Sequence, residues 1–323
     1  MSQPSVLHVL RPGLLTTVQD LGRRGHQSTG VAVAGPMDAF SHRLANWLVG
    51  NGPDAATLEC TLIGPHLEVE SDGLVAVAGA DFDLTLDGVS VPMHTAWPVR
   101  RGQVLAFGRR RQGARAYLAM GGGGILTTAV HGSRATHLPS RVGGLDGRAL
   151  RAGDQVPVPG AAPVVHRRAR GLVLPTAGRA RLRVLPGAEV SWFAEAAWQT
   201  LTRVSFQVSP RSNRMGYRME GPPLPVRRHD AMLSEAVARG SVQVPPSGEP
   251  ILLMADHQTT GGYPRIAHVI SADACVAGQL APGDFVEWVA CGPDEALAAL
   301  AAREHELAVQ TGGEATGGGG WAT

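Results

Sequence analysis

Short runs of alternating apolar and polar residues recur along the chain, and they constrain the fold more than any other feature of the sequence. In residues 82–91, FDLTLDGVSV, Asp87-Gly88 interrupts the alternation, which predicts a hairpin with a type I′ turn. A chain with many short strands needs closed or barrel-like sheets, because these hide the strand edges. We therefore predict a mainly β protein. Further strands are predicted at 67–70, 74–80, 103–107, 115–120, 181–185, 204–208, 241–244, 250–255 and 285–289.

Helical patterns are few. Residues 37–49 follow a Gly-Pro pair, carry their apolar residues on one face and stop at Gly50, as a capped amphipathic helix would. Two further helices are predicted at 189–201 and 293–309. The fold class is therefore mainly β with a few short helices.

The two halves of the chain resemble each other. TLECTLIGPHLEVESDGLVAVAGAD ends at Asp81, and MLSEAVARGSVQVPPSGEPILLMAD ends at Asp256. This alignment pairs Glu59 with Glu235. Two copies of one β-rich unit are the simplest account of the similarity.

A stretch rich in Pro, Ala and Arg lies between the two similar halves and marks the expected boundary. We expect a first domain at 1–160, a linker at 161–180 and a second domain at 181–310. The Gly-rich end at 311–323 is expected to be a flexible tail.

All 29 basic residues are arginine, and the chain has no lysine. This excludes a Walker A loop, a pyridoxal Schiff base and covalent biotin on this chain, since each needs a lysine. Cys60, Cys275 and Cys291 form no C-x-x-C pair, so neither a disulfide framework nor a metal site is predicted.

The net charge of +2 is too small to predict nucleic acid binding. No apolar run reaches the roughly 18 residues that a membrane span needs, and the first residues lack a signal-peptide pattern. We expect a cytoplasmic protein that does not bind membranes.

Residues 209–221, SPRSNRMGYRMEG, are the first candidate binding segment. Arg211, Asn213 and Arg214 suit a carboxylate or phosphate, because a guanidinium can bind two oxygens at once. The alternative is a turn whose arginines pair with acidic neighbours.

Residues 251–270 form the second candidate segment, a strand that stops at Asp256-His257 and restarts at Arg265. His257 can carry a proton near neutral pH, and Asp256 can orient its ring. The alternative is a wide hairpin with a satisfied histidine. Backbone N–H groups between the strands can form an anion-binding nest, which would involve Thr259, Thr260, Gly261 and Gly262.

Residues 16–38 form the third candidate segment. Gln19, Asp20 and Arg23 belong to a polar turn that contains glycine, and Asp38 opens the predicted helix. An Asp in this position more often caps a helix than takes part in catalysis.

The three segments together resemble the biotin-dependent carboxyltransferase, or allophanate hydrolase subunit 2, domain family. The resemblance covers about residues 6–292. It is carried by PGLLTTVQDLGRRGHQSTGVAVAGPMDAFSHRLANWLVGN, SNRMGYRMEG and DHQTTGGYPRIAHVISAD.

The resemblance implies two tandem, duplicated cyclophilin-like β-barrel domains. It also implies a subunit of an ATP-dependent 5-oxoprolinase complex, which opens 5-oxo-L-proline to L-glutamate. The partners would be proteins like the B and A subunits of 5-oxoprolinase, and ATP would act through the complex.

Two alternatives follow from the same resemblance. One is a carboxyltransferase component that acts on urea or a related amide, with biotin carried by another protein. The other is a non-catalytic regulatory partner of a kinase-inhibitor-like protein. Prolyl isomerase activity has the least support, since a fold alone does not carry an activity.

All these reactions pass through negatively charged oxygen, which needs cationic donors and a proton carrier. We expect Arg211 and Arg214 to hold that oxygen and His257, beside Asp256, to move the proton. The other candidate substrate-binding residues are Asn213, Thr259, Thr260, Gly261, Gly262, Tyr263, Gln19, Asp20, Asp38 and Glu235.

Overall fold

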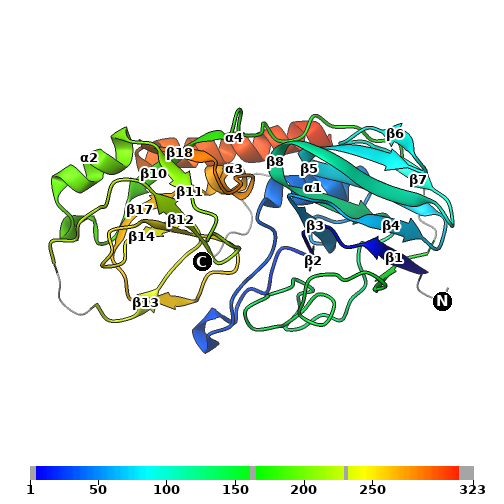
Figure 1. The fold of residues 1–323 in the computed structure, drawn as a ribbon, viewed down its shortest axis with the longest axis horizontal. Coiled ribbons are helices and arrows are strands. Elements are labelled where there is room, and N and C mark those ends of the chain that lie inside the picture. Colours follow the sequence, from blue (N-terminus) through cyan, green and yellow to red (C-terminus); the bar gives the residue numbers. More distant parts are fainter. Residues whose placement is uncertain (1–4, 161–164, 229–231, 313–323) are drawn as a thin grey trace.

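Two β units lie side by side in the computed structural model, which describes residues 5–160, 165–228 and 232–312. We call residues 5–160 the N-terminal unit and residues 179–290 the C-terminal unit. The long helix α4 (Pro293–Thr311) runs along the top of both units (Figure 1). It contacts the N-terminal unit through the Arg43–Glu304 ion pair, and Arg303 donates to the carbonyl of Ala272 beside the barrel. The mainly β fold class with few helices is confirmed.

The N-terminal unit is a curled sheet with strand order β2-β3-β8-β4-β1-β9, and β5 extends it beside β8 with β6 and β7 attached. Its strands are β1 (Ser5–Arg11), β2 (Leu15–Gln19), β3 (Thr57–Thr61), β4 (His66–Val69), β5 (Gly73–Leu86), β6 (Val89–Val91), β7 (Ala96–Val99), β8 (Val104–Met120) and β9 (Gln155–Val158).

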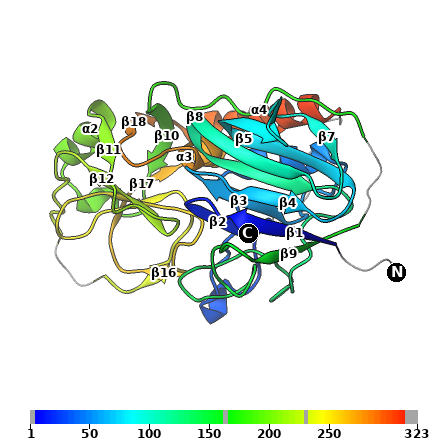
Figure 2. The same cartoon turned by 45° about the vertical axis from the view of Figure 1, so that its right-hand side comes forward.

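Strand β8 explains why this sheet curls into a half-barrel. The first part of β8 pairs with β4, its last part pairs with β3, and β5 follows it along most of its length (Figure 2). The two strands predicted at 103–107 and 115–120 are therefore one strand. The predicted type I′ turn between β5 and β6 is confirmed, because Asp87 and Gly88 have φ angles of 50° and 79°.

The C-terminal unit is a closed seven-stranded barrel in which β10 and β18 close the ring as a parallel pair. A separate two-stranded sheet, β13-β16, lies outside the barrel order. The strands are β10 (Arg179–Pro186), β11 (Phe206–Val208), β12 (Gly216–Glu220), β13 (Glu235–Ala236), β14 (Ser241–Gln243), β15 (Ile251–Leu253), β16 (Thr260–Gly261), β17 (Arg265–Val269) and β18 (Phe285–Ala290).

The two units have different strand orders. Glu59 lies within β3 of the large sheet, whereas Glu235, with which the sequence alignment pairs it, lies in the two-residue strand β13. The strand pairing of the two units therefore does not reproduce the residue-by-residue alignment of the two halves of the sequence. Duplication and the expected domain boundaries stay predictions, and most of the expected tail lies outside the described residues.

The helices are short apart from α4. Helix α1 (Ala39–Leu48) matches the prediction, and Asp38 caps it by accepting the N–H of Ser41 at 2.9 Å. Helix α2 (Glu195–Arg203) starts later than predicted. The remaining helical segments are η1 (Gln27–Thr29), η2 (Val190–Trp192), η3 (Ser271–Asp273) and α3 (Ala274–Gly278). No helix of the described chain is both long and apolar enough to cross a membrane.

Helix α1 connects the cores of the two units. Phe40, Leu44 and Leu48 pack with Tyr117 on the half-barrel. Met37, directly before the helix, is instead part of the apolar core of the barrel. The chain just before α1 is therefore buried between the two units.

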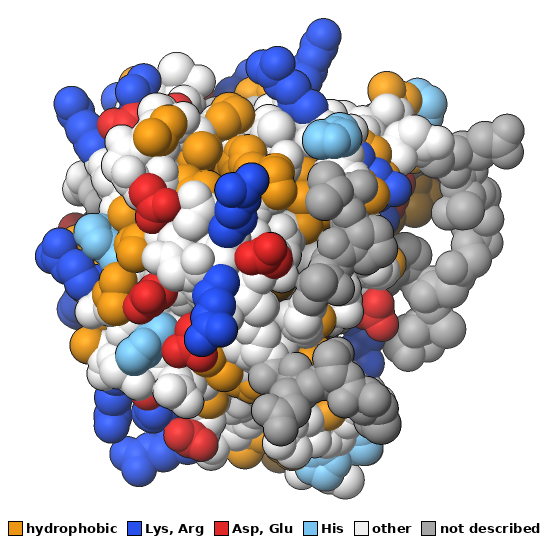
Figure 3. Space-filling view, turned by 90° about the vertical axis from the view of Figure 1, so that its right-hand side faces the viewer, with side chains coloured by type: hydrophobic (Ala, Val, Ile, Leu, Met, Phe, Trp, Pro, Cys, Tyr) orange, Lys and Arg blue, Asp and Glu red, His pale blue; other side chains and the backbone are white. Residues whose placement is uncertain are grey.

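The outer end of the N-terminal unit is visible in Figure 3. Arg, Asp and Glu side chains alternate there with apolar side chains, so the described part of this face has charges of both signs. It presents no continuous basic surface.

The polar side of α1 contains a buried histidine. Nδ1 of His42 lies 2.9 Å from Oγ1 of Thr57, and Nε2 lies 3.4 Å from Nδ2 of Asn46. Burial lowers the pKa of His42 to about 4, against 6.5 for a free histidine. The folded protein therefore keeps this ring neutral over a pH range in which the unfolded chain protonates it.

This difference predicts that stability falls as the pH decreases from 6.5 to 4. The unfolded state binds the extra proton in this range, so His42 weakens folding by up to about 1.4 kcal/mol per pH unit. Urea denaturation of the wild type and of His42→Gln at several pH values measures the effect. The slope should become smaller in His42→Gln and stay unchanged in the control His305→Gln, which alters an exposed residue of α4. Equal slopes in all three proteins would contradict the assignment.

Candidate functional site

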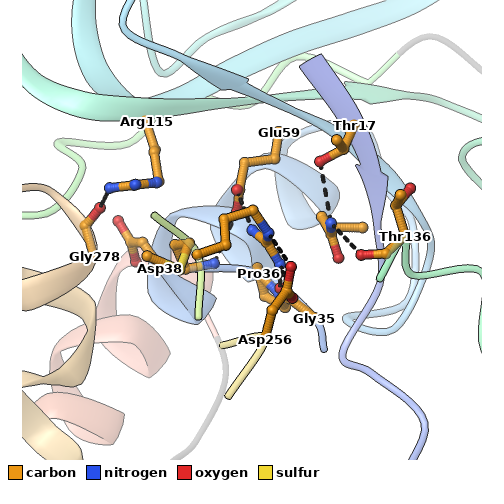
Figure 4. Close-up of polar contacts among 12 residues, drawn as sticks. Thr17, Gly35, Pro36, Asp38, Glu59, Arg115, Thr136, Asp256 and Gly278 are labelled. Atoms are coloured by element: carbon orange, nitrogen blue, oxygen red, sulfur yellow. Dashed lines mark hydrogen bonds and ion pairs between the residues drawn. The ribbon is translucent and has the colours of Figure 1, made fainter. Parts of the chain in front are cut away.

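A buried ion-pair network joins the two units. Nε and Nη2 of Arg214 donate to the carboxylate of Asp256 at 3.0 and 2.8 Å, and Nη1 pairs with Glu59 of β3 (Figure 4). Nη2 also donates to the carbonyl of Gly35 at 2.6 Å. At most 3% of each of the three charged side chains is exposed. Arg214 therefore uses every nitrogen of its guanidinium inside the protein.

The charges of this network stabilise one another. Burial alone would lower the pKa of Arg214, but the carboxylates of Asp256 and Glu59 outweigh it, and the pKa is raised. Burial would likewise raise the pKa of Glu59, but Arg214 and Arg115 outweigh it, and the pKa is lowered. Arg214 and Glu59 therefore stay ionised at neutral pH.

Glu59 also anchors the chain before α1. Its second oxygen accepts the N–H of Met37 and the hydroxyl of Tyr117, both at 2.8 Å. The Tyr117 oxygen in turn accepts the N–H of Asp38 at 2.7 Å. The start of α1 is thereby fixed against the half-barrel.

Asp38 connects this helix start to the barrel. Besides capping α1, its carboxylate accepts Nε2 of Gln279 at 2.7 Å. Oε1 of Gln279 accepts the N–H groups of Ala114 and Arg115, both at 3.0 Å. Burial raises the pKa of Asp38 in spite of these hydrogen bonds. The capping interpretation describes Asp38 well, because every contact that it makes is structural.

Two more arginines cross between the units, Arg115, which is buried, and Arg239, which is partly buried. Nη1 of Arg115, in β8, donates to the Tyr217 hydroxyl and to the Gly278 carbonyl, both at 2.6 Å. Arg239, from the barrel, donates to the carbonyls of Pro36, at 3.0 Å, and of Met37. The surface between the units is therefore fixed mainly by arginines that bind carboxylates and carbonyls.

A second polar cluster, formed by residues 17–23 and 133–137, lies beside the ion-pair network. Nε2 of Gln19 donates to Oγ1 of Thr17 and to the Thr136 carbonyl, both at 3.1 Å (Figure 4). Asp20 accepts the N–H of Gly22 at 2.9 Å and the Ser133 hydroxyl at 2.6 Å. Gln19 is completely buried, and Asp20 nearly so.

His137 connects this cluster to the C-terminal unit. Its Nε2 lies 3.4 Å from the carbonyl of Asp256, and its Nδ1 lies 2.5 Å from the Ser140 hydroxyl. His257, the next residue of the barrel loop, is coupled electrostatically to both Asp256 and His137. Side chains from both units therefore surround the region of Asp256 and His257.

The protonation of His257 is defined by one hydrogen bond. Its Nδ1 lies 2.6 Å from the carbonyl oxygen of Gln258. Because a carbonyl only accepts hydrogen bonds, Nδ1 carries the proton, and Nε2 of the neutral ring has a free lone pair. Burial lowers the pKa of His257. The ring is therefore a neutral base at pH 7, and the Gln258 carbonyl, not Asp256, orients it.

The remaining residues of the barrel loop lie outside this buried region. Thr260 and Gly261 form β16, which pairs with Ala236 and Glu235 of β13. Glu235 forms an ion pair with Arg265 at 2.9 Å. Thr259 is half-buried. The exposed residues of the loop are Thr260, Gly262 and Tyr263. These residues border the site from the side of the barrel.

The arginines of the first candidate segment have different environments. Arg211 is exposed and lies 3.5 Å from Glu249, whereas Arg214 is buried in the network. Oδ1 of Asn213 accepts the N–H of Met215 at 2.8 Å and so stabilises a turn. The structure thus separates Arg211 and Asn213 from Arg214, Asp256 and His257.

Several residues of the site are absent from the sequence-based candidates. They are Glu59, Tyr117, Arg115, Arg239, Gln279, Thr136 and His137. A charged residue within an apolar strand was an available signal for Glu59 and Arg115. Gln279 and Thr136 have no comparable signal, because their partners are mostly backbone groups distant in sequence.

Two cavities of about 530 Å³ each lie elsewhere. Arg179, Arg183 and Glu295 line one, and Met93, His94 and Arg168 line the other. None of the candidate residues lines either cavity. Within the described residues, no group of three or more His, Cys, Asp or Glu side chains could hold a metal ion.

A family model described as carboxyltransferase domain, subdomain A and B, matches residues 29–290. The chain belongs to this family. It is 42% identical over 296 residues to the C subunit of 5-oxoprolinase from Escherichia coli (strain K12), and the match covers 91% of this chain and 94% of that protein. It is 38% identical over 291 residues to the C subunit of 5-oxoprolinase from Haemophilus influenzae, with coverages of 90% and 92%.

Among solved structures, the urea amidolyase of K. lactis is similar with a TM-score of 0.88 at 29% identity. The match covers 96% of this chain but 20% of that chain. The present chain therefore spans about a fifth of that protein.

The network predicts that Arg214→Met strongly destabilises the protein. The substitution leaves Glu59 and Asp256 buried without their cation, which costs about 3–5 kcal/mol. Arg211→Met removes an exposed arginine from a similar sequence context and should change stability by less than about 1 kcal/mol. Urea denaturation of the two variants checks the prediction, and equal midpoints would show that the buried pairs are not needed for stability.

Proposed function

We propose that the chain is a subunit of an ATP-dependent 5-oxoprolinase complex that opens 5-oxo-L-proline to L-glutamate. The observation that carries this proposal is the match, nearly complete in both proteins, to relatives named as the C subunit of 5-oxoprolinase. The match to the urea amidolyase covers a far smaller part of that protein. The more complete matches therefore favour the first role.

The proposed partners are proteins that resemble the A and B subunits of 5-oxoprolinase. ATP is proposed to act through the complex, because the chain has no lysine and thus no Walker A loop for the phosphates. The missing lysine also means that any biotin would have to be attached to another protein.

His257 is the proposed proton carrier of the reaction. Opening an amide ring requires a base that removes a proton from the attacking nucleophile, and the free Nε2 lone pair of His257 meets this need at neutral pH. Thr259 and Thr260 follow His257 after one intervening residue and are proposed to orient the substrate. Arg214 and Asp256 keep the two units, and so the two sides of the site, at a fixed distance.

The second candidate function is a carboxyltransferase component that acts on urea or a related amide. It is favoured by the similarity of nearly the whole chain to a domain of urea amidolyase. A regulatory role without catalysis is the third candidate. The complete internal pairing of Arg214 and Asp256 favours it, since neither group is then free for a substrate.

The proposal predicts that glutamate is released from 5-oxoproline and ATP when the chain is mixed with its partner proteins. His257→Ala should lower the rate of the assembled complex by about 10²-fold or more, the usual contribution of a general base. The acid limb of the pH profile should have its midpoint below the ordinary pKa of histidine and should disappear in the variant. Stopped assays with glutamate detection measure both effects.

The control for this experiment is His305→Ala on the exposed face of α4, which should leave the rate unchanged. An unchanged rate in His257→Ala would remove His257 from the mechanism. If a folded, assembled complex releases no glutamate, carboxyl transfer from carboxybiotin or regulation by binding becomes the better interpretation.

A further inference from the structure

Arg23 is a buried cation whose hydrogen-bonding capacity is mostly unused. Its side chain is 1% exposed, and its Nη2 donates to the carbonyl of Ala135. Its Nε and Nη1 have no hydrogen-bond partner within the described residues. Buried polar groups without partners are rare, because each costs the free energy of its lost hydration.

The charge of Arg23 is also only partly compensated. Asp20 and Asp256 are near enough to attract it, but burial outweighs them and lowers the pKa of Arg23. Asp20 is bound to Gly22 and Ser133, and Asp256 is bound to Arg214. Within the described chain neither carboxylate accepts a hydrogen bond from Nε or Nη1 of Arg23, so these donors lack a direct anionic partner.

The arginines that cross between the units differ from Arg23. Arg214 uses all three of its nitrogens. Nη1 of Arg115 and both Nη atoms of Arg239 donate to groups of the opposite unit, although the Nε of each is buried without a partner among the described residues. These three arginines bridge the two units. Arg23 donates to a carbonyl of its own unit, and a structural bridge does not account for its position.

Gln19 supplies a second buried polar atom without a partner, in this case an acceptor. Its Nε2 must face the Thr136 carbonyl, which only accepts, so its Oε1 points away. That oxygen is buried and has no partner among the described residues. Gln19 and Arg23 bind the carbonyls of Thr136 and Ala135, so both side chains reach the same two-residue stretch of the chain.

Two glycines pack closely against Arg23 and Thr136. A Cβ at Gly143 would lie 2.5 Å from Nη2 of Arg23 and 2.1 Å from the Ala135 carbonyl oxygen. A Cβ at Gly144 would lie 1.9 Å from Oγ1 of Thr136. Both glycines have positive φ, as do Arg141 and Asp146 in the same segment. Segment 140–147 therefore packs closely, with a strained backbone, against Arg23 and Thr136.

We propose that Gln19 and Arg23 form a subsite for a small lactam that carries a carboxylate next to its ring N–H. Oε1 of Gln19 accepts the ring N–H, and the free donors of Arg23 bind the carboxylate. The inference rests on the proposed function, because 5-oxo-L-proline has this arrangement of groups. Segment 140–147 shifts to admit the ligand.

This subsite discriminates between the candidate substrates. Urea has N–H groups but no carboxylate, and it would leave the Arg23 charge uncompensated. A site built around a particular polar group rejects analogues that lack it, since its own buried groups then stay without partners. The subsite therefore favours 5-oxoproline over urea and over 2-pyrrolidinone, the same ring without the carboxylate.

The test measures binding of 5-oxoproline and of 2-pyrrolidinone to the assembled complex by calorimetry, and the KM for glutamate release. Arg23→Met and Gln19→Leu should each weaken 5-oxoproline binding at least tenfold, and Arg23→Lys should restore part of it. Binding of 2-pyrrolidinone should be weak in the wild type and unaffected by Arg23→Met. The control Arg111→Met changes an exposed arginine of β8 that is paired with Asp83 and should alter neither value.

Stability provides an independent readout. If Arg23 serves the ligand, removing its uncompensated charge should leave the Tm of the isolated chain unchanged or raise it, in contrast to Arg214→Met. A Tm that falls as far as in Arg214→Met would show that Arg23 is structural and would overturn the inference.

The outcomes separate the two proposals. If the complex releases glutamate and Arg23→Met keeps the wild-type KM and affinity, the inference is wrong and the proposed function stands. If 5-oxoproline binds through Arg23 but no glutamate appears, the proposed function is wrong and the subsite stands. A wild-type complex that does not bind 5-oxoproline overturns the inference.

Discussion

Arg214 is the residue on which the arrangement of the two units depends. It comes from the turn before β12, and its carboxylate partners lie in β3 of the half-barrel and after β15 of the barrel. Taking three charges out of water is costly, and only a complete set of ion pairs and hydrogen bonds offsets that cost. The units can therefore not slide or rotate without leaving a buried charge unpaired. This requirement fixes the helix start at Asp38, which both Tyr117 and Gln279 hold.

A chain without lysine uses arginine for structure and for binding alike, and the free donors distinguish the two uses. Arg214, Arg115 and Arg239 bind groups across the boundary between the units. Arg23 is as buried as Arg214 but has few contacts, and Oε1 of the buried Gln19 likewise lacks a partner among the described residues. A buried guanidinium that the fold does not use costs stability, so such a group is expected where a ligand completes its hydrogen bonds.

The sequence predicted the local features of the fold and missed the long-range ones. The Asp87-Gly88 turn, α1 and the main strands of the barrel follow from periodicity and turn chemistry over a few residues. Strands β1, β2, β3, β7, β9, β12, β13 and β16 and helix α3 were not predicted. Strand β3 is buried along its whole length, and β13 and β16 have only two residues each. The candidate segments contain residues of the site, but neighbours within a segment do not necessarily lie in the site together. Arg211 and Arg214 are three residues apart and face different environments. The pairing of Glu59 with Arg214 spans 155 positions, and no local pattern indicates it.

The rigid boundary also determines how a substrate reaches the site. Gln19 and Arg23 belong to the half-barrel, whereas the lone pair of His257 belongs to the barrel, so the ion-paired network sets the distance between the proposed binding groups and the proposed base. Opening the two units like a hinge would break the contacts of Arg214 with Glu59, at a cost of several kcal/mol. Entry must therefore occur through surface segments that can move at lower cost. Segment 140–147 holds non-glycine residues at positive φ, and the exposed loop after His257 belongs to the other unit. Both are positioned where a partner protein could change their conformation without disturbing the buried charges.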